Sequence, residues 1–186
     1  MSDVPEFQSF GKIPRLFRHI VLTEKLDGTN AQVIVTEDFD VYAGSRTRMI
    51  TPVDDNHGFA AWVEENEDDL RILGPGRHFG EWWGNGINRG YGLKNGDKRF
   101  SLFNTKRWDK EAGDGGRPAC CSVVPTIYEG PFDTELVKTF VEDLKVNGSW
   151  AVPGYMNPEG IVIYHSAGNL LFKVTVEGDD KAKSEV

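Results

Sequence analysis

The chain has 186 residues, of which 39% are hydrophobic and 27% are charged, and its formal net charge is −8. This length is enough for one sizeable domain with its own apolar core. The negative charge argues against a general nucleic-acid coat protein, which would be basic, but it does not exclude an enzyme with a local basic groove.

The sequence predicts a reducing, cytoplasmic location and no membrane partner. The longest apolar runs are short, as at residues 161–163, and cannot span a bilayer. Residues 1–6 are acidic and lack the apolar core of a signal peptide. Cys120 and Cys121 are adjacent, which matches neither a zinc spacing nor a secreted disulfide framework.

Strand-like segments dominate the chain. The first is the apolar, β-branched run at residues 19–24. Residues 31–36 and 39–43 follow, joined by the acidic turn Glu37-Asp38, and this pattern is typical of a hairpin. Further strands are predicted at residues 77–82, 99–103, 123–128, 160–165 and 169–176.

Two helices are predicted. The first spans residues 57–73, between a capping segment at residues 54–56 and a glycine–proline stop at residues 74–76. The second begins near Asp133 or Thr134 and ends at Asn147-Gly148. Its apolar residues recur at helical spacing and form one buried stripe, namely Leu136, Val137, Phe140, Val141 and Leu144.

These elements predict an α+β fold in which antiparallel strands outnumber helices. We expect a single domain over residues 1–186, with a flexible loop at residues 111–118 and a frayed tail at residues 178–186. Two basic clusters, at residues 12–19 and 83–107, either line a nucleic-acid surface or form solvated faces. The glycine-rich segment at residues 84–90 has the wrong spacing for a dinucleotide fingerprint.

The most informative segment is Glu24-Lys25-Leu26-Asp27-Gly28-Thr29-Asn30, where a strand gives way to a glycine-marked turn. A lysine at such a point is held by a rigid strand and can still face a cleft. Taken alone, Lys25-x-Asp27-Gly28 more often marks a surface lysine beside a hairpin. The functional interpretation of this motif depends on the segments that follow it in the sequence.

Lys25-x-Asp27-Gly28 resembles the first motif of the covalent nucleotidyltransferases, which include DNA ligases, RNA ligases and mRNA capping enzymes. The extended segment at residues 23–30 is most similar to the RNA ligases. Five further segments resemble the later motifs of this family, in the family's order: Ser45-Arg46-Thr47-Arg48, Phe79-Gly80-Glu81-Trp82, Arg99-Phe100-Ser101-Leu102-Phe103, Pro158-Glu159-Gly160-Ile161-Val162 and Phe172-Lys173-Val174-Thr175. The resemblance covers about residues 12–183.

The resemblance implies the nucleotidyltransferase (ATP-grasp-like ligase) fold. Because the sequence ends soon after the fifth motif, we expect no added OB barrel domain. It implies ATP and Mg²⁺ (or Mn²⁺) as cofactors, and RNA ends, possibly in a nicked duplex, as partners. Lys25 would be the nucleophile that takes AMP from ATP. Because a lysine amine is protonated at neutral pH, desolvation or a second cation such as Lys173 would help it lose that proton.

The resemblance also assigns roles to the residues around ATP. Arg46 and Glu81 would hold the ribose, since a carboxylate can accept from both hydroxyls. Phe103 would stack on the adenine.

Further roles concern the phosphates. Glu159 would orient a metal ion or the reacting lysine, and Lys173 would neutralise the α-phosphate. Asn30 would contact phosphates, and Glu24 would contact the adenine edge through its backbone.

Two positions depart from the family pattern. Thr175 stands where the fifth motif often has a second lysine, so the phosphate charge is either less well neutralised or compensated by Lys181 and Lys183. Asn104 stands where many relatives have an acidic residue. The sequence favours a minimal ATP-dependent RNA ligase. A minimal DNA ligase and a binding module of the same fold without sealing activity stay open as alternatives.

Overall fold

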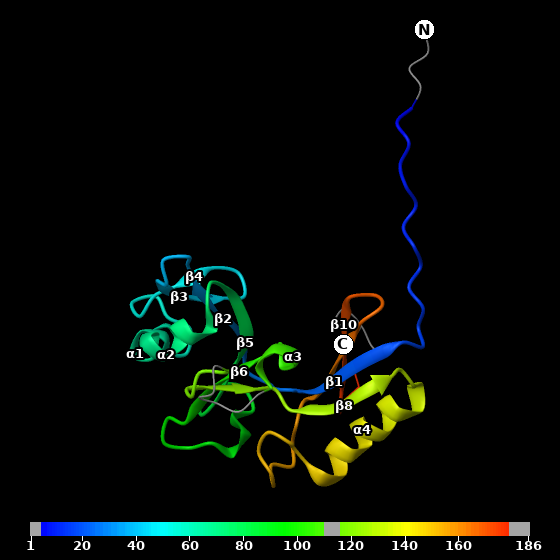
Figure 1. Ribbon diagram of the computed structural model, residues 1–186. Coiled ribbons are helices and arrows are strands. Elements are labelled where there is room, and N and C mark those ends of the chain that lie inside the picture. The colour runs from blue at the N-terminus through cyan, green and yellow to red at the C-terminus, as the bar shows by residue number, and fades with distance from the viewer. Residues whose placement is uncertain (1–4, 110–115, 179–186) are drawn as a thin grey trace.

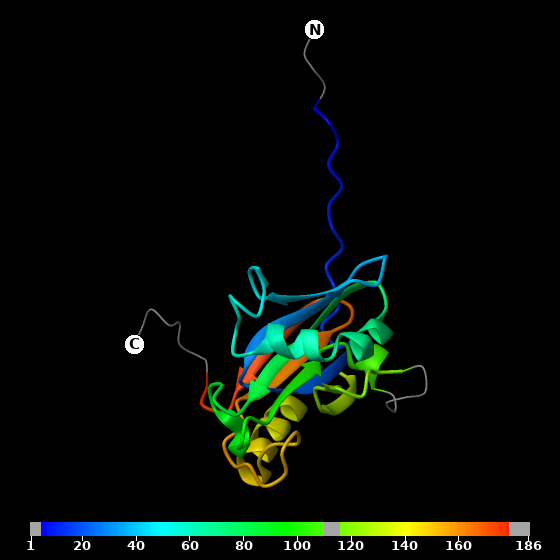
Figure 2. The same cartoon turned by 90° about the vertical axis from the view of Figure 1, so that its left-hand side faces the viewer.

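The computed structural model describes residues 5–109 and 116–178. Two sheets form its frame, one with strand order β10-β9-β1-β8 and one with order β4-β3-β2-β5-β6-β7. The strands β6 and β7 pair in parallel, and the other strand pairs of the described residues are antiparallel. Each sheet belongs to its own lobe (Figures 1 and 2). Residues 5–15 leave the body as an extended arm, whereas residues 16–18 contact the lobe of the first sheet.

The first sheet consists of β1 (His19–Lys25), β8 (Thr126–Pro131), β9 (Gly160–His165) and β10 (Leu170–Thr175). Its one covered face packs against α4 (Thr134–Asn147), which lies below the sheet in Figure 1. Asp133 caps this helix, because its side chain accepts from the N–H groups of Glu135 and Leu136. The core between the helix and the sheet contains Ile20, Leu22, Val141, Leu144, Ile161 and Ile163.

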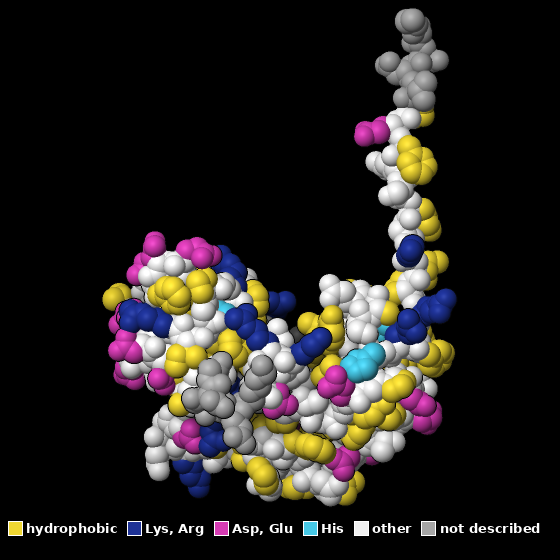
Figure 3. Space-filling model, in the orientation of Figure 1, with side chains coloured by type: hydrophobic (Ala, Val, Ile, Leu, Met, Phe, Trp, Pro, Cys, Tyr) yellow, Lys and Arg dark blue, Asp and Glu magenta, His cyan; other side chains and the backbone are white. Residues whose placement is uncertain are grey.

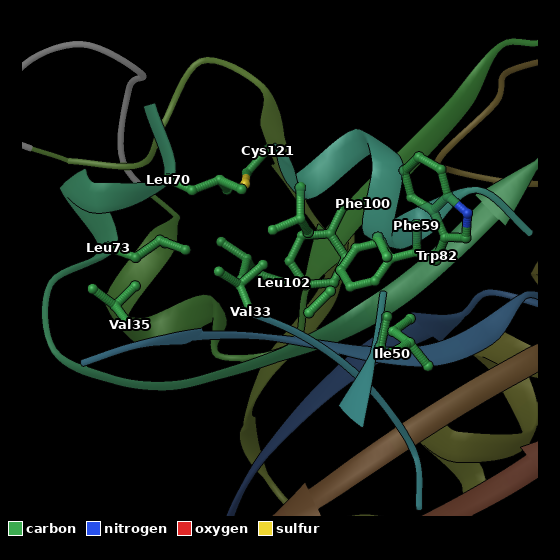
Figure 4. Packing of buried hydrophobic residues seen from close by; sticks show 14 of the residues in the cluster. Val33, Val35, Ile50, Phe59, Leu70, Leu73, Trp82, Phe100, Leu102 and Cys121 are labelled. Atoms are coloured by element: carbon green, nitrogen blue, oxygen red, sulfur yellow. The ribbon is translucent and has the colours of Figure 1, made fainter. Parts of the chain in front are cut away.

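The second sheet consists of β2 (Thr29–Val35), β3 (Val41–Ser45), β4 (Met49–Ile50), β5 (Gly76–Gly84), β6 (Lys98–Leu102) and β7 (Cys121–Val123). The short helices α1 (Phe59–Glu65), α2 (Glu67–Leu70) and η1 (Arg71–Leu73) cover one of its faces. Figure 4 shows the core between them, where Phe59, Trp82 and Phe100 pack together. Two further short helices, η2 (Gly90–Gly92) and α3 (Thr105–Trp108), lie in the connections that flank β6.

The α+β prediction is confirmed, and antiparallel strands dominate as expected. The prediction of one continuous helix over residues 57–73 is wrong. His57 and Gly58 have φ angles of 55° and 81°, so the helix begins only at Phe59. Asn66 then breaks it, because its backbone leaves the helical region while its side chain donates to the carbonyl of Trp62.

The predicted strand at residues 123–128 is divided between the two sheets. β7 ends at Val123 and β8 begins at Thr126, so the chain passes from the second sheet to the first through Val124 and Pro125. A proline cannot donate to a strand ladder, which favours a break at this point. The loop expected at residues 111–118 and the tail expected at residues 178–186, with Lys181 and Lys183, fall largely outside the described residues.

In the part of the chain that the structure describes, no helix is long and apolar enough to cross a membrane.

Candidate active site

The turn after Lys25 connects the two sheets. Lys25 ends β1 in the first sheet, and Thr29 begins β2 in the second. Because side chains alternate along a strand, Leu22 points into the core beneath α4, whereas Lys25 lies on the opposite face. Figure 3 shows a notch between the two lobes, with Lys and Arg side chains along it.

Glu159 is the direct partner of Lys25. The Lys25 Nζ atom lies 2.7 Å from Glu159 Oε2, and the side chains are 24% and 17% exposed. The sheet explains this contact, since Lys25 pairs in register with Gly160 at the start of β9. A Cβ atom at Gly160 would lie 2.2 Å from the carbonyl oxygen of Val174, so glycine allows β9 and β10 to approach closely here.

Glu81 lies on β5 of the second sheet, across the site from the first sheet that carries Lys25. It is 8% exposed and pairs in register with Asn30 across β5 and β2. Its carboxylate accepts from the Gly28 N–H at 3.0 Å and from Asn30 Nδ2 at 3.2 Å. Burial raises the pKa of Glu81 to about 7, although the Gly28 hydrogen bond and the charge of Lys25 oppose this rise.

Residues 88–91, which we call the brace, hold the Lys25 turn from outside. The Tyr91 hydroxyl accepts from the Asp27 N–H at 3.0 Å and donates to the Lys25 carbonyl at 3.4 Å. Asn88 Nδ2 donates to Asp27 Oδ1 at 3.0 Å. Asn88 and Tyr91 have φ angles of 44° and 51°, a left-handed region that asparagine tolerates but that a bulky residue such as tyrosine rarely adopts. Such strained residues often occur at functional sites, where the surroundings hold them in place.

Arg89, within the brace, joins three separate segments. Its Nε donates to Asp27 Oδ2 at 2.9 Å, and its Nη1 donates to Asn157 Oδ1 at 2.7 Å. Its Nη2 donates to Glu177 Oε1 at 3.1 Å. Asn157 lies two residues before Glu159, and Glu177 follows β10. Arg89 therefore links the turn after Lys25 to the segment that carries its partner carboxylate.

The remaining candidates lie on other strands and turns. Lys173 is exposed on β10 and pairs with Val162, whereas Thr175 pairs with Gly160 and so shares a register row with Lys25. Arg46 is exposed in the turn after β3, and the structure shows no hydrogen bond or ion pair between its side chain and the other described residues. Phe103 directly follows β6, and its side chain is on the face of the sheet that carries Glu81.

The side chain of Glu24 points away from Lys25, into the opposite face of β1. It is 1% exposed, and its Oε2 accepts from the N–H groups of Trp150 and Ala151 at 2.8 Å each. Burial raises the pKa of Glu24. A contact with adenine would therefore involve only the backbone of Glu24, while its side chain anchors the loop after α4.

Sequence reasoning missed the brace. The available signal was the glycine-rich segment at residues 84–90, which does not match a dinucleotide motif. Its glycine and asparagine residues instead allow the left-handed backbone conformations that shape this loop. The structure also accounts for Asn104, whose side chain accepts from the Arg107 N–H and caps α3.

The acidic residues of the site could supply only some of the ligands of a metal ion, so the phosphates of a bound nucleotide would have to supply others. Among the described residues, no group of three or more His, Cys, Asp or Glu side chains could hold a metal ion alone. Mg²⁺ commonly binds through one or two carboxylates together with substrate phosphates. Glu159, beside Lys25, fits that pattern.

Comparison with known proteins places this geometry in context. The family model described as RNA ligase matches residues 18–175, which is most of the chain. Among curated protein sequences, none matches this chain significantly.

Solved structures share the fold. A variant of Naegleria gruberi RNA ligase with AMP and Mn has a TM-score of 0.62 and 19% identity, covering 94% of this chain and 57% of that one. Another variant of that ligase with AMP and Mn has a TM-score of 0.60 and 18% identity, covering 87% and 51%. An archaeal ATP-dependent RNA ligase has a TM-score of 0.56 and 16% identity, covering 91% and 48%. The chain thus spans about half the length of these proteins.

Proposed function

The chain belongs to the RNA ligase family, and we propose that it is an ATP-dependent RNA ligase that acts through a covalent Lys25–AMP intermediate. The observation that carries this proposal is the position of Lys25. Its amine lies at a junction of two sheets, 2.7 Å from Glu159, with the buried Glu81 close enough for its pKa to respond to the lysine charge.

The first step would form the intermediate. The neutral Lys25 amine attacks the α-phosphorus of ATP, a P–N bond forms, and the bond to the β-phosphate breaks so that pyrophosphate leaves. Before the attack Lys25 must lose a proton, and Glu159 Oε2 is the acceptor within hydrogen-bond distance. Lys173, on the same face of the first sheet, would neutralise the α-phosphate.

The nucleoside would lie against the second sheet. Glu81, oriented by Gly28 and Asn30, would accept from the ribose hydroxyls, with Arg46 on the turn beyond β3 as its partner. Phe103 would stack on the adenine, and its 42% exposed side chain is open to a ligand. Asn30 would approach the phosphates, and the Glu24 backbone would approach the adenine edge.

A divalent ion fits this site with Glu159 as its protein ligand. When bound, Mg²⁺ or Mn²⁺ would offset phosphate charge and favour the departure of pyrophosphate. The AMP and Mn recorded for the Naegleria gruberi ligase variants support the choice of these cofactors.

Two further steps would complete the ligation. An oxygen of an RNA 5′-phosphate attacks the phosphorus of Lys25–AMP, the P–N bond breaks, and the lysine amine takes up a proton. A 3′-hydroxyl then attacks the activated 5′-phosphorus, a phosphodiester forms, AMP leaves, and the hydroxyl proton passes to solvent.

Covalent labelling tests the proposal. The protein is incubated with magnesium and ATP labelled at the α-phosphate, and acid-labile label on the protein is measured. We expect label on the wild type and none on Lys25→Ala. Lys94→Ala is the control, because Lys94 is an exposed lysine that lies outside the site.

Three results would change the assignment. Label that persists in Lys25→Ala would remove Lys25 as the nucleophile. An unlabelled wild type would favour a nucleotide-binding module of the same fold. If the protein is labelled, comparing nicked RNA, nicked DNA and single-stranded RNA tells an RNA ligase from a minimal DNA ligase.

A further inference from the structure

The second sheet has a face that its core does not use. Residues 33, 43 and 102 point into the core beneath α1, so their neighbours along each strand point the other way. On this opposite face three aromatic side chains are exposed: Tyr42 by 49%, Phe79 by 53% and Phe103 by 42%.

Sheet register brings these side chains into adjacent rows. Phe79 pairs with Gln32 on β2, and its carbonyl accepts from the Phe103 N–H at 3.0 Å. Tyr42 pairs with Ile34, which in turn pairs with Arg77. Arg77 is fixed on this face by its Nη1, which donates to Gln32 Oε1 at 3.0 Å. We call Tyr42, Phe79, Phe103 and Arg77 the aromatic platform.

The edge of the platform carries positive charge. Phe79 and Phe103 line a hollow of about 140 Å³ together with Arg77, Arg107 and Asn104, and no acidic residue lines it. Arg107 is held in place there, since its Nη2 donates to the Leu73 carbonyl at 2.9 Å. In a chain with a net charge of −8, this hollow is a local exception.

The platform is too wide for the adenosine of ATP alone. Tyr42 on β3 and Phe103 on β6 are separated by three strand spacings, about 14 Å. Phe103 lies one row from Glu81, so it is the member that ATP would reach. Phe79 and Tyr42 extend the face beyond that position.

We propose that the aromatic platform binds unpaired nucleotides of the RNA strand that is to be joined, with bases stacked on Phe79 and Tyr42 and phosphates facing Arg77 and Arg107. Exposed aromatic side chains on a sheet are a common means of holding single-stranded RNA, and arginine suits its phosphates. The proposal rests on the ligase function proposed above, and it names the surface that would hold the RNA end beside the adenylylated lysine.

The chemistry of the face favours RNA over a protein partner. Stacking accepts any base, and the positive hollow matches a phosphate chain. An apolar protein partner would leave Arg77 and Arg107 without counter-charges.

Binding of a fluorescent single-stranded oligoribonucleotide to the full chain tests the proposal, alongside the covalent labelling assay. Phe79→Ala and Tyr42→Ala should each weaken RNA binding by about tenfold, the loss of one stacked base. Phe39→Ala is the matched control, because Phe39 is 47% exposed in the turn between β2 and β3. Tyr42→Phe keeps the ring and should retain RNA affinity.

Arg77→Ala tests the phosphate contact. It should lower the slope of log affinity against log salt by about 0.7 for single-stranded RNA. An unchanged slope would remove Arg77 from the RNA-binding surface.

The two assays separate the two proposals. RNA affinities of Phe79→Ala and Tyr42→Ala equal to that of Phe39→Ala would overturn the platform, even if Lys25 is labelled. A loss of labelling in Tyr42→Ala as large as its loss of RNA binding would assign the face to ATP and also overturn it. Absence of label on the wild type would instead count against the ligase function, while RNA binding would still be measured.

Discussion

The turn that carries Lys25 and the aromatic platform border the same site, but they are held very differently. The turn is fixed by hydrogen bonds that Asn88 and Arg89 donate to Asp27, and by the Tyr91 hydroxyl and the Glu81 carboxylate, which accept from the Asp27 and Gly28 N–H groups. The platform rings are about half exposed. The difference fits the two proposed tasks. Covalent chemistry needs a nucleophile within a fraction of an ångström, whereas stacking on bases of any identity tolerates adjustment.

Removing Arg89 should loosen the turn that carries Lys25, and we expect this change to have the largest effect on activity. In Arg89→Ala, the Lys25 turn loses its link to Asn157 and Glu177, and we expect adenylylation at saturating ATP to slow by about 100-fold. The ATP concentration for half-maximal rate should change much less, because in this proposal Arg89 acts by positioning Lys25 and not by binding ATP.

Variants in the same loop make that test specific. Lys94→Ala removes an exposed cation near the brace and should react like the wild type. Arg89→Lys should recover only part of the rate, because one ammonium cannot replace the fork that reaches three acceptors. If Arg89→Ala keeps the wild-type rate, the brace does not position Lys25.

The raised pKa of Glu81 predicts that ATP binding at this site depends on pH. Above a pKa of about 7 the carboxylate is ionised and can accept from both ribose hydroxyls, whereas below it the protonated group loses acceptor capacity. ATP affinity should therefore fall by about tenfold from pH 8 to pH 6.

That affinity is best measured by calorimetry on the wild-type protein with an ATP analogue whose α- and β-phosphates are joined by a methylene group, because this analogue cannot react and Lys25 keeps its charge beside Glu81. Adding Glu81→Gln should flatten the dependence on Glu81, leaving only the titration of the analogue itself. A pH profile that is identical with and without Glu81→Gln would show that Glu81 does not hold the ribose in its ionised form.

Glu24 distinguishes anchoring of the fold from contact with ATP. Glu24→Ala leaves the N–H groups of Trp150 and Ala151 without their acceptor, and we expect unfolding free energy to fall by about 1–3 kcal/mol. Glu24→Gln keeps an acceptor and should cost less. Denaturant unfolding measures both, and an unchanged midpoint for Glu24→Ala would contradict the anchoring role.

The platform should give the smallest effect on stability. Tyr42→Ala removes a side chain that is 49% exposed, so its unfolding free energy should stay within about 0.5 kcal/mol of the wild type. A larger loss in denaturant unfolding would mean that the ring supports the fold, and the contrast between a held turn and an open platform would disappear.

Strands with clear boundaries could be predicted from sequence. Residues 160–165 were bounded by a glycine and a turn, and the structure has β9 at Gly160–His165. The helix α4 followed from its apolar stripe and the cap at Asp133. The helix at residues 57–73 failed because local competition at Asn66 outweighed an overall helical pattern.

The candidate site was predictable only where a motif named a residue. The structure places Lys25, Asn30, Glu81 and Glu159 around one turn, although their roles stay proposals. Arg89 could not be found this way. Its partner Asp27 lies 62 residues away in sequence, and contacts between distant segments leave no mark in local periodicity.

The alternation of β1 has a consequence for which genetic changes the protein can survive. Glu24 and Lys25 are neighbours whose side chains serve opposite faces, one anchoring the loop after α4 and the other pairing with Glu159. Deleting or inserting a single residue in β1 would exchange every side chain between the two faces. The lysine would then take the buried position of Glu24, among N–H donors, and Ile20 and Leu22 would turn away from the core beneath α4. Short length changes in this strand should therefore be eliminated more strictly than any conservative substitution in it.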